Sequence, residues 1–227
     1  MAYIVVAVVV ACILSVITAY LYIKYNYAKR IFFKILSSFA FVLLAVIVII
    51  HSNSGIYAYG ILIALILGFL GDILLSLHPL LNEKDKELFN LSGLVAFLLG
   101  HFAYIAVFIN ISGFKLILLP FILIIPLVVL LMIRMKVINS KKASIPALMY
   151  SVIISAMLVT AINVFIYHAV NNSFIILIAA ILFVCSDLIL TFYNFSKYRL
   201  QWMMPLCLIF YYAAEIIFAL SIYLITR

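Results

Sequence analysis

The chain has 227 residues, of which 70% are hydrophobic and 9% are charged, and its mean hydropathy is +1.44. This composition excludes a soluble globular domain, in which about 25% of residues are charged. The net charge of +8 requires no nucleic-acid partner, because basic loops beside anionic lipid headgroups account for it. We therefore expect an all-α polytopic membrane protein whose surroundings are membrane lipids.

Apolar runs long enough to cross a bilayer, about 20 residues each, recur along the whole chain. The sequence predicts eight transmembrane helices, at approximately 3–22, 31–50, 56–77, 91–111, 115–134, 145–168, 173–194 and 203–225. The fourth and fifth are the least clearly separated, because only Ile111 to Phe114 lies between them. All connections are short, so we expect residues 1–227 to form a single integral membrane domain.

Basic residues in short loops set the orientation of such a protein. If the loop after the first helix faces the cytoplasm, twelve of the 14 Lys and Arg residues lie on that side, and only Lys115 and Arg227 lie opposite. Both termini are then predicted on the non-cytoplasmic side. The first run lacks a positive n-region and a cleavage site, so we expect it to be retained as a helix. The Ile and Lys usage favours a bacterial inner membrane.

Metal and cofactor chemistry find little support in the residue pattern. A zinc site needs three clustered ligands, whereas only one of the four histidines, His101, lies near the centre of a predicted span. There is no Gly-x-Ser-x-Gly elbow to present a serine nucleophile and no nucleotide-binding glycine loop. We predict neither a metal nor a cofactor.

Three acidic residues lie inside predicted spans: Asp72 in the third, Asp187 in the seventh and Glu215 in the eighth. An ionisable group there costs about 2.5–3.5 kcal/mol on insertion scales, and it marks either a functional site or a buried helix–helix hydrogen bond. Counting about 1.5 Å per residue from the cytoplasmic ends places them and His101 between the midplane and the inner leaflet. We expect them to share one cavity. Lys34 either joins this cavity or, on the simpler expectation, snorkels to the interface.

Aromatic hydroxyl groups accompany these ionisable residues. Tyr104 lies one turn after His101, and Tyr211 and Tyr212 lie one turn before Glu215. Side chains three or four residues apart share a helix face, so we expect these tyrosines to position or polarise a substrate in the same cavity.

Four short motifs occur in the order and spacing of a known family. They are Gly71-Asp72 with Leu74, Gly93 with Phe97 and His101-Phe102-Ala103-Tyr104, Phe183 with Ser186-Asp187, and Tyr211-Tyr212-Ala213-Ala214. Together they make the chain resemble the lysoplasmalogenase (YhhN-like) family of eight-span membrane proteins. Phe33-Lys34 is similar to that family's Lys-Pro signature, with Ile35 in place of the proline. Glu215 stands where the family usually has a glutamine or another neutral polar residue.

The resemblance implies hydrolysis of the vinyl-ether bond of a lysoplasmalogen, lysoplasmenylethanolamine or -choline, to a fatty aldehyde and a glycerophospho-alcohol. Vinyl ethers break in acid, because protonation of the β-carbon creates an oxocarbenium ion that water attacks. In a low-dielectric cavity one of two carboxyl groups can stay protonated while the other stays ionised.

The sequence does not decide which aspartate is the acid. We take Asp187 as the proton donor and Asp72 as the charged group that orients water. The remaining predicted site residues bind or support the substrate, with Lys34 attracting its phosphate; they are Lys34, His101, Tyr104, Ser186, Tyr211, Tyr212 and Glu215.

Buried Asp, Glu and His residues would equally serve a proton-coupled transporter or a lipid-binding membrane protein. Transporters often contain internal repeats and paired broken helices. Neither is evident here, although the third and seventh spans each carry one Asp. Aldehyde release from a lysoplasmalogen would distinguish a hydrolase from these alternatives. The sequence does not determine the oligomeric state.

Overall fold

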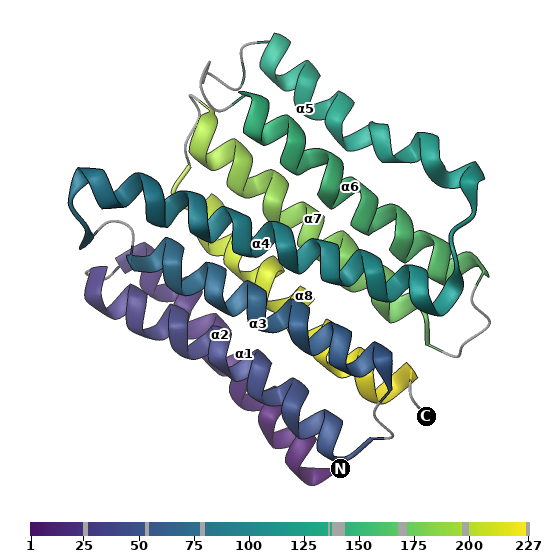
Figure 1. The fold of residues 1–227 in the computed structure, drawn as a ribbon. Coiled ribbons are helices and arrows are strands. Elements are labelled where there is room, and N and C mark those ends of the chain that lie inside the picture. The colour runs from purple at the N-terminus through teal and green to yellow at the C-terminus, as the bar shows by residue number, and fades with distance from the viewer. Residues whose placement is uncertain are drawn as a thin grey trace.

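The structure is a computed structural model that describes residues 1–24, 27–52, 55–77, 80–135, 137, 144–167, 172–196 and 200–225. Its regular elements are all helices (Figure 1). In chain order they are α1 (Ala2–Lys24), α2 (Tyr27–Ile50), α3 (Ile56–Leu77), α4 (Glu83–Ser112), the 3₁₀ helix η2 (Leu116–Leu123), α5 (Ile124–Arg134), α6 (Ser144–Tyr167), α7 (Phe174–Phe195) and α8 (Met203–Ile225).

The described residues contain eight helical stretches that are long and apolar enough to cross a membrane, and η2 and α5 together make the fifth. The predicted all-α, eight-helix fold is therefore confirmed. Two helices begin earlier than predicted, α2 at Tyr27 and α4 at Glu83. Both extensions contain Lys, Arg or Glu, which favour helix beyond the apolar run.

Gly113 explains how two spans are separated by so few residues. Its φ of 64° is readily adopted only by glycine, and its N–H donates to the carbonyl oxygen of Ile109 at 2.8 Å. This turn ends α4, and η2 begins three residues later.

Five helices close a ring around the interior of the described bundle. α3 packs on α4, α4 on α6, α6 on α7, α7 on α8 and α8 on α3. α1 and α2 cover the α8 and α3 side of this ring, whereas η2 and α5 pack against α6 at the opposite edge (Figure 1). Within the described residues α3 and α7 do not pack against each other, because α8 lies between them.

Large aromatic side chains fill the interior of the ring. Tyr104 on α4 stacks on Phe218 of α8 with ring centroids 4.3 Å apart, and Phe108 lies beside both. These three side chains are at most 1% exposed. Such packing fixes the rotation of α4 and α8, and it turns the polar side chains of both helices away from lipid.

Candidate active site

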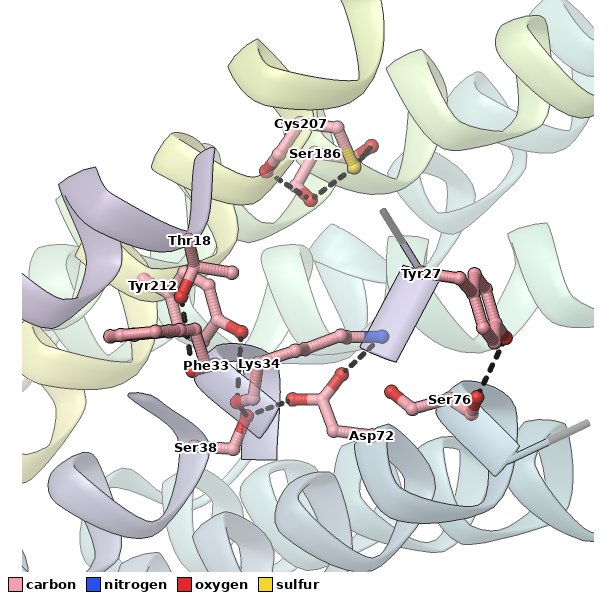
Figure 2. A network of polar contacts seen from close by, with 10 residues as sticks. All are labelled: Thr18, Tyr27, Phe33, Lys34, Ser38, Asp72, Ser76, Ser186, Cys207 and Tyr212. Carbon is pink, nitrogen blue, oxygen red and sulfur yellow. Dashed lines mark hydrogen bonds and ion pairs between the residues drawn. The ribbon is translucent and has the colours of Figure 1, made fainter. Parts of the chain in front are cut away.

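A buried ion pair joins α2 to α3 (Figure 2). Lys34 Nζ lies 3.0 Å from Asp72 Oδ1, and the Ser38 hydroxyl donates to Asp72 Oδ2 at 2.6 Å. Ser38 follows Lys34 by one helical turn, so both side chains project from the same face of α2. Lys34 is 7% exposed and Asp72 is 2% exposed. The ammonium group supplies the Asp72 carboxyl group with a counter-charge, and the hydroxyl group supplies it with a hydrogen-bond donor.

The expectation that Lys34 snorkels to the interface is wrong. Its side chain stays in the interior because Asp72 supplies a counter-charge there. Tyr212 belongs to the same part of the site, since its hydroxyl donates to the backbone carbonyl of Lys34 at 3.3 Å. Tyr27 adds a second link between α2 and α3, because its hydroxyl donates to the backbone carbonyl of Ser76 at 2.8 Å (Figure 2).

Asp187 lies in a second polar group, formed by α4, α6 and α7. Tyr150 donates its hydroxyl to Asp187 Oδ2 at 3.2 Å, and His101 Nε2 lies 3.6 Å from the same oxygen. His101 Nδ1 is 2.7 Å from the carbonyl oxygen of Phe97. A carbonyl can only accept, so Nδ1 carries a hydrogen.

The His101 tautomer has a consequence for Asp187. With the hydrogen on Nδ1, a neutral imidazole presents the lone pair of Nε2 to a carboxylate oxygen, and two acceptors facing each other repel. At 3.6 Å this contact is not a hydrogen bond. Asp187 therefore faces an imidazole nitrogen, whereas Asp72 is paired with a lysine.

Glu215 forms the third polar group. The Tyr104 hydroxyl donates to Glu215 Oε2 at 2.6 Å, and Glu215 is 1% exposed. A Cβ atom at Gly68 would lie 2.9 Å from Glu215 Oε1 and 3.3 Å from the Tyr211 hydroxyl oxygen. The absence of a side chain at Gly68 thus makes room for both groups against α3. Tyr211 lies beside Glu215, as expected of a residue one turn before it. Tyr104, expected beside His101, also contacts Glu215, whereas Tyr212, expected beside Glu215, contacts the Lys34 carbonyl instead.

The three groups approach one interior from different helices. Gly68, one turn before Asp72 on α3, faces Glu215 of α8, and Tyr104, which donates to Glu215, lies one turn after His101 on α4. Aromatic rings lie among them: the centroid of Tyr211 is 5.5 Å from that of Phe183 on α7. The two aspartates are therefore related through α8 and not through direct packing of α3 on α7.

Ser186 supports the site through helix packing. Its hydroxyl donates to the carbonyl of Cys207 at 3.0 Å and lies 3.3 Å from the Cys207 sulfur (Figure 2). This contact fixes α7 against α8 at the residue next to Asp187.

Two hydrogen-bond partners of the aspartates were not predicted from the sequence. Ser38 could have been predicted, because it lies one turn from Lys34 on the same helix face. Tyr150 could not, because only the packing of α6 on α7 brings it to Asp187. Among the described residues, no three His, Cys, Asp or Glu side chains group closely enough to hold a metal ion.

A hollow of about 300 Å³ lies at the end of the bundle where α1 ends and α2 begins. Its lining residues come from α1, α2, α7, α8 and the segment before α8; they are Tyr22, Ile23, Arg30, Tyr193, Gln201 and Met204. None of the three buried carboxyl groups lines it. Arg30 precedes Lys34 by one turn, so the hollow adjoins the ion pair along α2.

Eight membrane-crossing helices around buried carboxyl, imidazole and phenol groups define an integral membrane protein with a polar core. The sequence model of the YhhN family matches residues 29–222, which is most of the chain. The chain therefore belongs to the YhhN family. Membership suggests a lysoplasmalogenase-type, hydrolase-like activity at the level of the family. Neither a curated protein nor a solved structure matches the chain at a significant level.

Proposed function

We propose that this protein hydrolyses the vinyl-ether bond of lysoplasmalogens in a bacterial inner membrane. Family membership supports the class of reaction. The observation that carries the mechanism is the difference between the two aspartates. Asp72 is paired with Lys34 at 3.0 Å, whereas Asp187 Oδ2 faces the Nε2 atom of His101 at 3.6 Å. In this proposal Asp187 carries the proton. One carboxylate and one proton donor are what acid cleavage of a vinyl ether needs.

In the proposed reaction Asp187 transfers its proton to the β-carbon of the vinyl ether, and the α-carbon and ether oxygen become an oxocarbenium ion. Asp72 stabilises this cation and orients a water molecule. The water oxygen bonds to the α-carbon and gives a proton back to Asp187, which leaves a hemiacetal. Loss of the glycerol oxygen as an alcohol then yields the aldehyde, and one water is consumed overall.

Buried polar atoms without protein partners support a substrate or water position near these groups. His101 Nε2 and Ser76 Oγ are both buried and accept or donate no hydrogen bond within the protein. Ser76 follows Asp72 by one turn on α3, and His101 faces Asp187. Such atoms in a native interior call for a bound partner. Tyr104, Tyr211 and Glu215 complete the polar wall in this proposal.

Aldehyde release by purified protein tests the reaction. In detergent with lysoplasmenylethanolamine, the unaltered protein should release fatty aldehyde. Asp187→Asn should reduce the rate about 10²- to 10⁴-fold, because it removes a general acid. Asp85→Asn, at the exposed start of α4, is the matched control and should leave the rate unchanged. Equal rates for Asp187→Asn and the unaltered protein, at equal folded yield, would remove Asp187 from the mechanism.

A proton-coupled transporter is the second candidate, because the Asp187–His101 pair would also serve as a proton relay. Proteoliposomes with an imposed pH gradient separate the two functions. Lysophospholipid uptake that follows the gradient, without aldehyde release, would favour transport.

A further inference from the structure

The hollow beside α1 and α2 holds a half-buried cationic group. Arg30 is the one charged residue among the six that line it. Its Nε atom is buried and has no hydrogen-bond partner, and its guanidinium carbon lies 5.4 Å from the ring centroid of Tyr22. Among the described residues, no carboxylate forms an ion pair with it. A guanidinium N–H that faces no acceptor in a hollow is suited to an anionic ligand.

We propose that this hollow binds the phosphate of the lysophospholipid headgroup, with Arg30 as its principal contact. The inference rests on the proposed function, since it assigns the headgroup of that same substrate. Lys34 is poorly placed for this role, because its Nζ atom already lies 3.0 Å from Asp72 Oδ1. A guanidinium group also matches phosphate oxygens with two parallel N–H donors, which an ammonium group does not.

The length of the substrate agrees with this position. Arg30 precedes Lys34 by four residues, about 6 Å along α2, and Tyr193 follows Asp187 by six residues, about 9 Å along α7. Seven bonds separate the phosphorus of a lysoplasmalogen from the β-carbon of its vinyl ether. Three bonds of an extended chain span about 3.3–3.6 Å, so seven reach about 8 Å. A phosphate at Arg30 therefore brings the reactive carbon to the depth of Asp72 and Asp187.

The size and lining of the hollow also fit a headgroup. Its volume of about 300 Å³ is at the lower end of the range for small-molecule sites. Gln201 offers a neutral hydrogen-bonding group, and among the described residues that line the hollow none is acidic and would repel a phosphate. The alkenyl chain would extend away from it, along the apolar helices.

Binding of a saturated ether analogue tests the assignment without turnover. The probe is tritiated 1-O-alkyl-glycerophosphoethanolamine, which lacks the vinyl ether, bound to the full chain in detergent. Arg30→Gln should weaken binding about 10- to 100-fold, the effect of losing a charged hydrogen bond. Lys29→Gln is the matched control, an exposed basic residue on the same helix turn, and should bind as the unaltered protein. Arg30→Lys should show an intermediate loss, and it provides the readout if Arg30→Gln does not fold.

Two further binding measurements identify the part of the ligand that Arg30 contacts. A 1-O-alkylglycerol without phosphate should bind the unaltered protein and Arg30→Gln equally. Glycerophosphoethanolamine should displace the probe at lower concentration than inorganic phosphate. Equal displacement by the two would mean a free-anion site and would overturn the headgroup assignment.

The two proposals fail separately. Arg30-dependent binding without aldehyde release would keep the phosphate site and remove the hydrolase. Aldehyde release together with unchanged binding by Arg30→Gln and Arg30→Lys would keep the hydrolase and remove the phosphate site.

Discussion

Replacing Lys34 by methionine should destabilise the bundle strongly. At 3.0 Å the attraction between Lys34 and Asp72 is about 5–6 kcal/mol for an effective dielectric constant of about 20. Desolvation of both groups offsets most of this attraction in the intact pair. Lys34→Met removes only one partner, and the charge of Asp72, 2% exposed, is left unpaired. The expected loss of unfolding free energy is about 3–5 kcal/mol.

Thermal unfolding of the purified protein in detergent measures this loss. For a chain of this size 3–5 kcal/mol corresponds to a fall in melting temperature of roughly 6–20 °C. Lys34→Met/Asp72→Asn should regain most of the stability, because the double variant buries no unpaired charge and the new amide oxygen still accepts from Ser38. Lys29→Met, the exposed control on α2, should unfold like the unaltered protein. If the double variant unfolds at as low a temperature as Lys34→Met, an unpaired charge is not the cause and the reasoning is refuted.

Three further results are expected. Tyr104→Phe removes the hydroxyl that donates to Glu215 Oε2 at 2.6 Å, and it should lower the free energy of unfolding by about 1–3 kcal/mol. Tyr59→Phe, on the exposed face of α3, is the control, and an equal loss in both variants would contradict this prediction. Gly68→Ala places a Cβ atom 2.9 Å from Glu215 Oε1 and should lower the free energy of unfolding by about 1–3 kcal/mol. Gly55→Ala, whose Cβ atom would have nothing within 4 Å, should leave stability unchanged, and equal effects of the two substitutions would argue against the tight contact. A fluorescent reporter that folds only in the cytoplasm should stay dark when fused after Arg227, and a bright fusion would reverse the predicted orientation.

The eight spans were predictable because hydropathy and length are properties of consecutive residues. Each predicted run corresponds to one membrane-length helical stretch of the structure. Helix starts were less predictable, because α2 and α4 continue into charged residues where the apolar signal has ended. The same limit explains why η2 was predicted only as part of an ordinary span.

Neighbour relations within the bundle were harder to predict. The depth of Asp72 and Asp187 follows from counting residues, but their separation by α8 depends on the order in which helices surround the interior. The pairing of Lys34 with Asp72 likewise depends on how α2 is rotated against α3. Apolar residues on every face of these helices leave that rotation unspecified by periodicity.

The 3₁₀ geometry of η2 changes how far the fifth span reaches. From Leu116 to Arg134 the chain has 19 residues, eight of them in η2 and eleven in α5. A 3₁₀ helix rises about 2.0 Å per residue and an α-helix about 1.5 Å, so this span measures about 33 Å, against about 29 Å if it were α-helical throughout. The hydrocarbon thickness of a bilayer is about 30 Å. The 3₁₀ winding around Pro120 thus lengthens the span with the fewest residues among those described, enough to match the bilayer without local thinning of the lipid.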